Sequence, residues 1–266
     1  MAKSNFIALG LAAVLACEPA LSADTSAIDQ GVYVGVFGGL GASIATSMRQ
    51  QGQVLNLPRP LPIDANGSTG SSTRVALGGA QLGYEWSRWE LGQSKWALRP
   101  AVELESFYIG KHTPTGEMPV VPRALGTQYV STPMTAGVVL ANVILNFKTP
   151  YSDRILPYVG AGAGMAFLSI KDSDSANPSE PGINHFNSDP SASDSAFAVQ
   201  LKAGIKGEIS KNLYLFTEYR YLSVEATSYT FGATDYPGLH LPTTTWRFNM
   251  GRQHYNLFVA GLQYRF

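Results

Sequence analysis

The sequence predicts an all-β protein: a single eight-stranded antiparallel up-and-down β-barrel that crosses a membrane. Three observations predict this fold. Eight segments alternate apolar residues with polar or small ones at a period of two, which is the period of a β-strand. The connections between these segments are alternately short and long. Charged residues make up only 14% of the 266 residues, against roughly 25% in an ordinary soluble domain.

The first 23 residues have the composition of a signal peptide. Lys3 supplies positive charge, an apolar run follows over 6–16, and small residues near Ala23 suit cleavage. The run is shorter than the ~20 residues that a transmembrane helix needs. The single cysteine, Cys17, lies in a VLAC motif that loosely resembles a lipoprotein cleavage site, and we interpret it as part of the discarded leader. We therefore expect export, with a barrel over 24–266 that contains no disulfide.

Strands are expected where the alternation is sustained. In the segment FAVQLKAGIKGEI, Val199 and Leu201 occupy one face, whereas Gln200 and Lys202 occupy the other. The eight expected strands cover residues 32–44, 75–86, 96–109, 134–147, 156–170, 197–209, 213–224 and 255–266. In chain order, their apolar faces carry Val34 and Leu40, Leu82 and Trp86, Val102 and Leu104, Val139 and Val143, Val159 and Phe167, Val199 and Leu201, Leu215 and Tyr219, and finally Phe258 and Leu262.

The connections predict the topology. Short turns join the second strand to the third, the fourth to the fifth and the sixth to the seventh. Long loops rich in Pro, Gly, Ser, Asn and Thr cover 46–74, 110–132, 171–195 and 225–253. This alternation places all four long loops at one end of a meander, and loops of such length usually carry function or are disordered. Aromatic residues in the last loop are expected to form either an adhesive surface or a packed cap.

The apolar face is expected to contact lipid. Periodicity alone also allows a soluble, lipocalin-like barrel with the apolar face inside. Lipid is favoured because the opposite face is rich in glycine, as at Gly160, Gly162 and Gly164, and glycine is a poor choice for a solvated strand surface. Aromatic residues also concentrate near the strand ends, as in the interfacial girdles of membrane barrels.

Charges of both signs lie on the face opposite the apolar one. A buried, unpaired charge costs several kcal/mol, so an interior of this kind must pair its ions. We expect these residues to form salt bridges that plug the lumen, although they could instead line a small pore. The predicted interior network consists of Arg99, Glu103, Glu105, Lys202, Lys206, Glu208, Glu218, Arg220 and Arg265.

The last residues and several strand motifs carry a resemblance to a known family. The chain stops at Phe266, preceded by Tyr264 and Gly261, which resembles the terminal assembly signal of bacterial outer-membrane proteins. Val259 departs from that pattern, where a polar residue is usual. Together with LPYVGAGAGMAF and LYLFTEYRYL, these residues make the chain similar to the OmpA-like, opacity-type barrels of eight strands. The resemblance implies a Gram-negative outer membrane, recognition by the barrel assembly machinery, and contact with lipid and lipopolysaccharide.

No catalytic or metal-binding motif stands out. The histidines His112, His185 and His240 lie in long loops and His254 lies at the edge of the last strand, without metal-ligand spacing. The acidic residues of loop 171–195 lack the regular spacing of a calcium loop, so we interpret them as a solvated charge run. We expect no enzymatic activity, no cofactor and no metal.

The functional prediction is a monomeric surface barrel with a structural, antigenic or adhesive role carried by its loops. Its expected partners are a host or envelope protein or a glycan. The net charge of zero gives no support to nucleic-acid binding, which needs a basic surface. Two alternatives remain: a small, low-conductance porin, and an outer-membrane hydrolase that modifies lipid.

Overall fold

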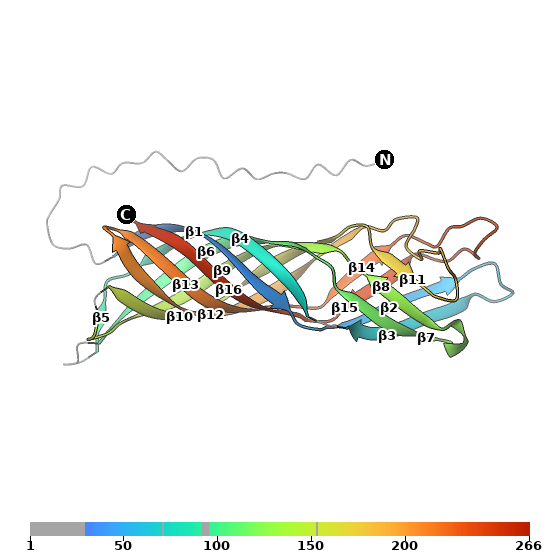
Figure 1. Ribbon diagram of the computed structural model, residues 1–266, viewed down its shortest axis with the longest axis horizontal. Helices are drawn as coiled ribbons and strands as arrows, with labels where there is room; N and C mark the ends of the chain where they lie inside the picture. Colours follow the sequence, from blue (N-terminus) through green and yellow to red (C-terminus); the bar gives the residue numbers. More distant parts are fainter. Residues whose placement is uncertain (1–29, 71, 92–95, 153) are drawn as a thin grey trace.

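A closed antiparallel barrel forms one half of the molecule (Figure 1). The computed structural model describes residues 30–266 except 71, 92–95 and 153, so the expected signal peptide and Cys17 lie outside the described residues. The barrel strands are β1 (Gly31–Ser43), β4 (Thr73–Glu85), β6 (Ala97–His112), β9 (Met134–Lys148), β10 (Ile155–Ile170), β12 (Ala192–Ser210), β13 (Leu213–Val224) and β16 (Gln253–Arg265).

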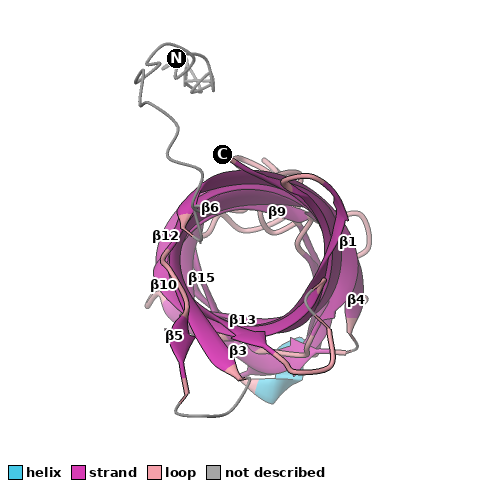
Figure 2. Ribbon diagram, turned by 90° about the vertical axis from the view of Figure 1, so that its left-hand side faces the viewer, coloured by secondary structure: helices cyan, strands magenta, loops and turns pink. Residues whose placement is uncertain are grey.

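Each barrel strand pairs with its neighbours along the chain, and β1 pairs with β16 to close the ring. The view along the barrel axis shows this closure (Figure 2). The short strand β5 (Trp89–Glu90) pairs with the start of β6. These pairings confirm the predicted fold class. No helix within the described part of the chain is long and apolar enough to cross a membrane.

The predicted orientation of the two strand faces is confirmed. Leu201 points outward and is 60% exposed, whereas the adjacent Lys202 points into the lumen and is 4% exposed. Glycines on the inner face leave room for larger neighbours. A Cβ on Gly162 would lie 1.9 Å from Oδ1 of Asn142, and one on Gly164 would lie 2.0 Å from the backbone oxygen of Val139. The glycine-rich face of β10 is therefore required by close packing inside a narrow barrel.

The long loops form a second β-structure rather than irregular segments. Their strands join in a seven-stranded sheet that continues from one end of the barrel (Figure 1), and we call this part the cap. Its elements are β2 (Ser47–Val54), β3 (Leu61–Thr69), β7 (Thr115–Val121), the 3-10 turn η1 (Arg123–Leu125), β8 (Thr127–Ser131), β11 (Asp174–Ala176), β14 (Thr227–Phe231) and β15 (Trp246–Met250). The sheet order is β11-β8-β7-β3-β2-β15-β14.

The cap has the opposite polarity to the barrel. Strand β7 buries Met118 and Val120 and exposes Glu117, and strand β2 buries Met48 and exposes Arg49. The cap is therefore apolar inside and polar outside, as expected for a body surrounded by water. The barrel is apolar outside, as expected for a body surrounded by hydrocarbon, and its buried charged residues point inward.

The aromatic residues of loop 225–253 lie inside the cap. Tyr229, Phe231, Trp246 and Phe248 are each at most 2% exposed. Of the two alternatives expected for this loop, the packed cap is therefore correct, and these four rings form no adhesive surface. The reason is that strands β14 and β15 alternate with a period of two, which turns every aromatic residue of this set to the same, inner side.

Residues 177–191 cover the gap between the two edge strands of the cap, β11 and β14. The backbone amide of Gly232 donates to the oxygen of Asp189 at 2.9 Å, and Asn187 exchanges hydrogen bonds with the backbone of Asp235. Phe186 is fully buried and stacks on Phe231 with ring centroids 4.3 Å apart. This segment of the third loop thus packs along the fourth loop and completes the wall of the cap.

Candidate functional site in the lumen and the cap

One ion cluster lies in the lumen near the end that carries the short turns. The carboxylate of Glu85 lies at its centre, and Glu85 is 1% exposed. Its oxygens lie 2.5 Å from Nζ of Lys206, 3.5 Å from Nη1 of Arg99 and 3.3 Å from Nη1 of Arg265. The side chain of Asn146 donates a further hydrogen bond at 3.2 Å. Three predicted network residues therefore meet at one buried carboxylate.

A second ion cluster lies farther along the lumen toward the cap. Lys202 Nζ lies 2.5 Å from Glu103 and 3.2 Å from Glu105. Arg220 contacts Glu105 at 3.3 Å and donates from Nε to Glu218 at 2.5 Å. All five side chains are at most 3% exposed. The strands bring these five predicted residues into one dry network, in which cations alternate with carboxylates.

Neutral donors complete the second cluster. Tyr33 donates to Glu103 at 2.9 Å, and Tyr158 donates to Glu218 at 2.7 Å. Asn142 donates to Glu103 at 3.3 Å, and Gln200 donates to Glu105 at 2.6 Å. Buried carboxylates need such donors, because one cation cannot satisfy all the lone pairs of a carboxylate.

The structure differs from the predicted network at two residues. Glu208 is exposed, because it lies at the barrel mouth where the register with β13 shifts between Glu208 and Ser210. Water solvates its carboxylate there, so Glu208 is not part of the buried network. Glu85, the centre of the first cluster, was missing from the prediction. Its position on the polar face of β4, two residues after Gly83, was the only sequence signal for it.

The lumen is filled at every level that the structure describes. The cavity beside the two ion clusters measures about 20 Å³, which accommodates about one water molecule. Above it, the guanidinium of Arg220 lies 4.1 Å from the ring centroid of Phe37. Buried apolar side chains then continue toward the cap, among them Phe107, Ile109, Leu140 and Leu257.

The residues of the predicted assembly signal lie at the end of β16. Tyr264 and Phe266 point outward, are 43% and 68% exposed, and contact each other edge to face at 5.1 Å. Gly261 faces inward, where a Cβ would lie 2.5 Å from the backbone oxygen of Val36. This placement gives two aromatic side chains to the lipid-facing rim, and the role of these residues in assembly stays a prediction.

Two of the four histidines are held by tyrosines of the barrel. His112 is buried and packs edge to face against Tyr255, with ring centroids 5.9 Å apart. His254 stacks on Tyr221, whose hydroxyl lies 2.8 Å from Nδ1 of His254. Neither ring forms a hydrogen bond or ion pair with a carboxylate of the described residues, so neither shows the Ser-His-Asp arrangement of a hydrolase.

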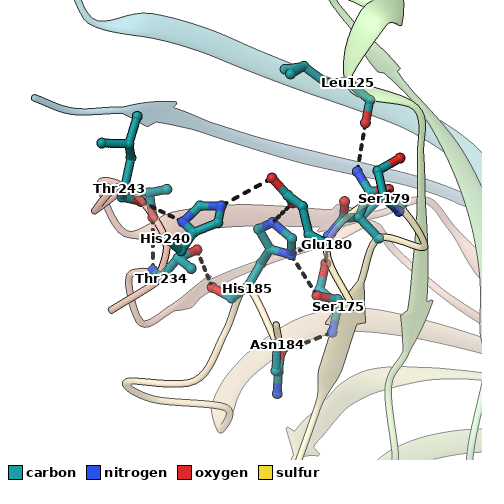
Figure 3. A network of polar contacts seen from close by, with 12 residues as sticks. Leu125, Ser175, Ser179, Glu180, Asn184, His185, Thr234, His240 and Thr243 are labelled. Atoms are coloured by element: carbon teal, nitrogen blue, oxygen red, sulfur yellow. Dashed lines mark hydrogen bonds and ion pairs between the residues drawn. The ribbon is translucent and has the colours of Figure 1, made fainter. Parts of the chain in front are cut away.

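The other two histidines meet in the cap, a contact that their spacing in the sequence does not indicate. His185 and His240 both point toward Glu180 (Figure 3). Nε2 of His185 lies 3.1 Å from Oε2 of Glu180, and Nε2 of His240 lies 3.3 Å from Oε1. Burial lowers the pKa of His185 below its usual value. A cavity of about 60 Å³ adjoins this cluster and is also lined by Gln50, Gln128 and Trp246.

A closed eight-stranded antiparallel barrel with an apolar outer surface is the architecture of outer-membrane proteins. Residues 7–266 match the family described as "Outer membrane protein beta-barrel domain", and the chain belongs to this family. The protein is accordingly located in the outer membrane of a Gram-negative bacterium. Comparison with curated proteins gives no match. In such barrels the long loops are extracellular and the short turns are periplasmic, and the placement of the cap outside the cell stays a prediction for this chain.

Solved structures of other outer-membrane barrels are similar to the chain at low identity. Neisserial surface protein A shares 15% identity, with a TM-score of 0.39 over 89% of this chain and 97% of that one. OprG from Pseudomonas aeruginosa shares 13% identity, with a TM-score of 0.45 over 89% and 96%. The outer-membrane protease OmpT from Escherichia coli shares 8% identity, with a TM-score of 0.42 over 87% and 97%. The absence of enzymatic activity stays a prediction for this chain.

Proposed function

We propose that this protein is a non-conducting surface barrel that presents its cap to a protein or glycan outside the cell. The observation that carries the proposal is the filled lumen. Two ion clusters occupy its periplasmic half, and apolar side chains occupy the rest up to the cap. Eight strands enclose a space that side chains essentially fill, whereas aqueous channels need about sixteen strands or more.

The outer surface of the cap supports a role in recognition. Many of its exposed positions are polar side chains held on paired strands, so binding through them costs little ordering entropy. Arg49 and Asp64 form an ion pair on this surface, and Gln51 contacts the same carboxylate. A rigid surface of amides, hydroxyls and scattered charges suits contact with glycans and with polar protein surfaces.

The first experiment is planar-bilayer recording of the refolded protein. We expect no steady conductance from the native chain. A variant in which short turns replace 46–70, 113–131, 172–191 and 226–251 removes the cap but keeps the ion clusters, and it should also be silent. Steady channels from either protein would contradict the proposal and favour the porin alternative.

The second experiment measures binding by vesicles that carry the protein. Panels of immobilised glycans and extracellular-matrix proteins serve as probes. We expect binding above that of empty vesicles and its loss in the variant without the cap. Binding should also be reduced in Arg49→Ser combined with Arg247→Ser, because both arginines are exposed on the paired strands β2 and β15. Arg154→Ser is the matched control, because Arg154 is exposed at the opposite end of the barrel. Equal binding by the native and the capless protein would contradict the role of the cap.

A further inference from the structure

The cluster of Glu180, His185 and His240 lies where the third loop crosses the fourth. Glu180 and His185 belong to the segment that fills the gap between β11 and β14, and His240 belongs to the loop between β14 and β15. The side chain of His185 is 7% exposed, that of His240 is 12% exposed and that of Glu180 is 35% exposed. The group therefore faces the cavity rather than open solvent.

The hydrogen-bond partners of His240 do not match those of a neutral histidine. Nδ1 of His240 lies 2.5 Å from the backbone oxygen of Leu241, and its Nε2 faces Oε1 of Glu180. A carbonyl or carboxylate oxygen only accepts, and a neutral imidazole carries a single N–H, so one acceptor beside a neutral His240 receives no proton from the ring. At His185, Nδ1 lies 2.8 Å from both the backbone oxygen of Ser175 and the side-chain nitrogen of Gln128, and Nε2 faces Oε2 of Glu180.

Two arrangements satisfy the acceptors beside His240. Protonation gives the ring a second N–H and an ion pair with Glu180. A cation bound between the two Nε2 atoms and the carboxylate does so as well, because His240 then donates Nδ1–H to its carbonyl and offers the Nε2 lone pair to the ion, which is the usual support of a metal-bound histidine. The ring of His185, with its centroid 5.5 Å from that of His240, presents its own Nε2 to the same carboxylate, and this convergence of two imidazoles favours the bound cation.

The distances fit a small tetrahedral ion. Zinc binds histidine nitrogen and carboxylate oxygen at about 2.0–2.2 Å, so neighbouring ligand atoms of a tetrahedron lie roughly 3.3 Å apart. The two His–Glu distances are 3.1 and 3.3 Å, and one ligand atom from each of the three residues lies within 4.8 Å of the others. The ligand atoms are therefore already close to the spacing that coordination requires.

We propose that Glu180, His185 and His240 bind one divalent transition-metal ion of the zinc class, which links the third and fourth loops of the cap. Two imidazoles and one carboxylate favour such an ion over calcium or magnesium, which prefer sets of oxygen ligands. The adjoining cavity leaves room for a water molecule as the fourth ligand.

The test is zinc titration of the untagged, refolded mature protein by calorimetry after treatment with a chelator. We expect one zinc ion per chain, whereas calcium and magnesium at the same concentration should give no heat of binding. His185→Gln and His240→Gln should each weaken zinc binding by ~100-fold or more, since loss of a mere supporting partner costs ~10–100-fold. His254→Gln is the matched control, because His254 stacks on Tyr221 in the barrel and should bind zinc unchanged.

X-ray absorption at the zinc edge of the native complex gives a measurement that needs no variant. We expect scattering from two imidazole rings. Heat-modifiable migration on gels shows that each variant has folded, and Glu180→Gln offers a third variant at a partly exposed position. The proposal is overturned if the native protein binds no stoichiometric zinc, if His240→Gln binds as tightly as the control, or if the spectrum contains oxygen ligands alone.

Discussion

Loss of one lysine in the lumen gives the sharpest test of the ion network. Lys202 is the cation nearest to Glu103, at 2.5 Å, and both side chains are at most 3% exposed. In Lys202→Met, Glu105 keeps Arg220 and Gln200 as partners. Glu103 keeps only neutral donors. An uncompensated buried carboxylate destabilises a folded protein by about 3–5 kcal/mol. With a urea m-value of ~3 kcal/mol per M, the unfolding midpoint should fall by ~1–1.7 M.

The measurement is equilibrium urea unfolding of the barrel refolded in lipid vesicles, followed by tryptophan fluorescence. Adding Glu103→Gln to the lysine variant removes the unpaired charge, so the double variant should recover more than half of the lost stability. Arg252→Gln is the control, because the pair between Arg252 and Glu225 is about half exposed and contributes at most ~1 kcal/mol. The reasoning is refuted if Lys202→Met destabilises the barrel no more than Arg252→Gln does.

Three further predictions concern the packing of the barrel and the cap. Gly164→Ala should abolish heat-modifiable folding, because the Cβ of the new alanine would lie 2.0 Å from the backbone oxygen of Val139. Gly137→Ala should fold normally, since no atom lies within 4 Å of a Cβ at that position. Burial raises the pKa of Tyr229 to about 12, so the folded cap holds this proton more tightly than the unfolded chain does, and this group should lower the free energy of unfolding by ~1 kcal/mol from pH 10 to pH 11. Urea titrations at both pH values should show a loss that is larger by this amount in the native chain than in Tyr229→Phe. Phe186→Ala leaves a cavity that should destabilise the cap by about 3–5 kcal/mol and speed cleavage of 177–191 by proteinase K, whereas Leu239→Ala, at a position 73% exposed, should not.

The barrel was predictable because each strand shows its alternating pattern within its own dozen residues. Alternation over a dozen residues fixes which face each side chain occupies, and lipid imposes the same rule on all eight strands. The side chains of Lys202, Glu103 and Arg220 therefore point into the lumen, as predicted. The partner of each charged side chain depends on the register between strands, which the sequence pattern does not predict. Glu85 and Glu208 both occupy alternating positions, but only the first lies at a level where other strands surround it.

The cap was less predictable because its strands are short and pair across loops that are distant in the chain. Strand β2 pairs with β15, about two hundred residues away in sequence, and no local pattern specifies that contact. The Pro-rich and Ser-rich composition of these segments favoured irregular loops. The Glu180, His185 and His240 cluster was missed for the same reason, because its third residue comes from another loop and the spacing forms no motif.

The alternation of the cap strands also determines what an antibody raised against this protein can recognise. Only every second side chain of β2 faces outward, so a linear peptide copied from this loop displays residues that the folded protein hides. Register places Arg49 opposite Asn249 on one side and opposite Asn66 on the other. A native epitope therefore runs across three strands from two different loops, and immunisation with the folded protein should elicit antibodies that single-loop peptides do not.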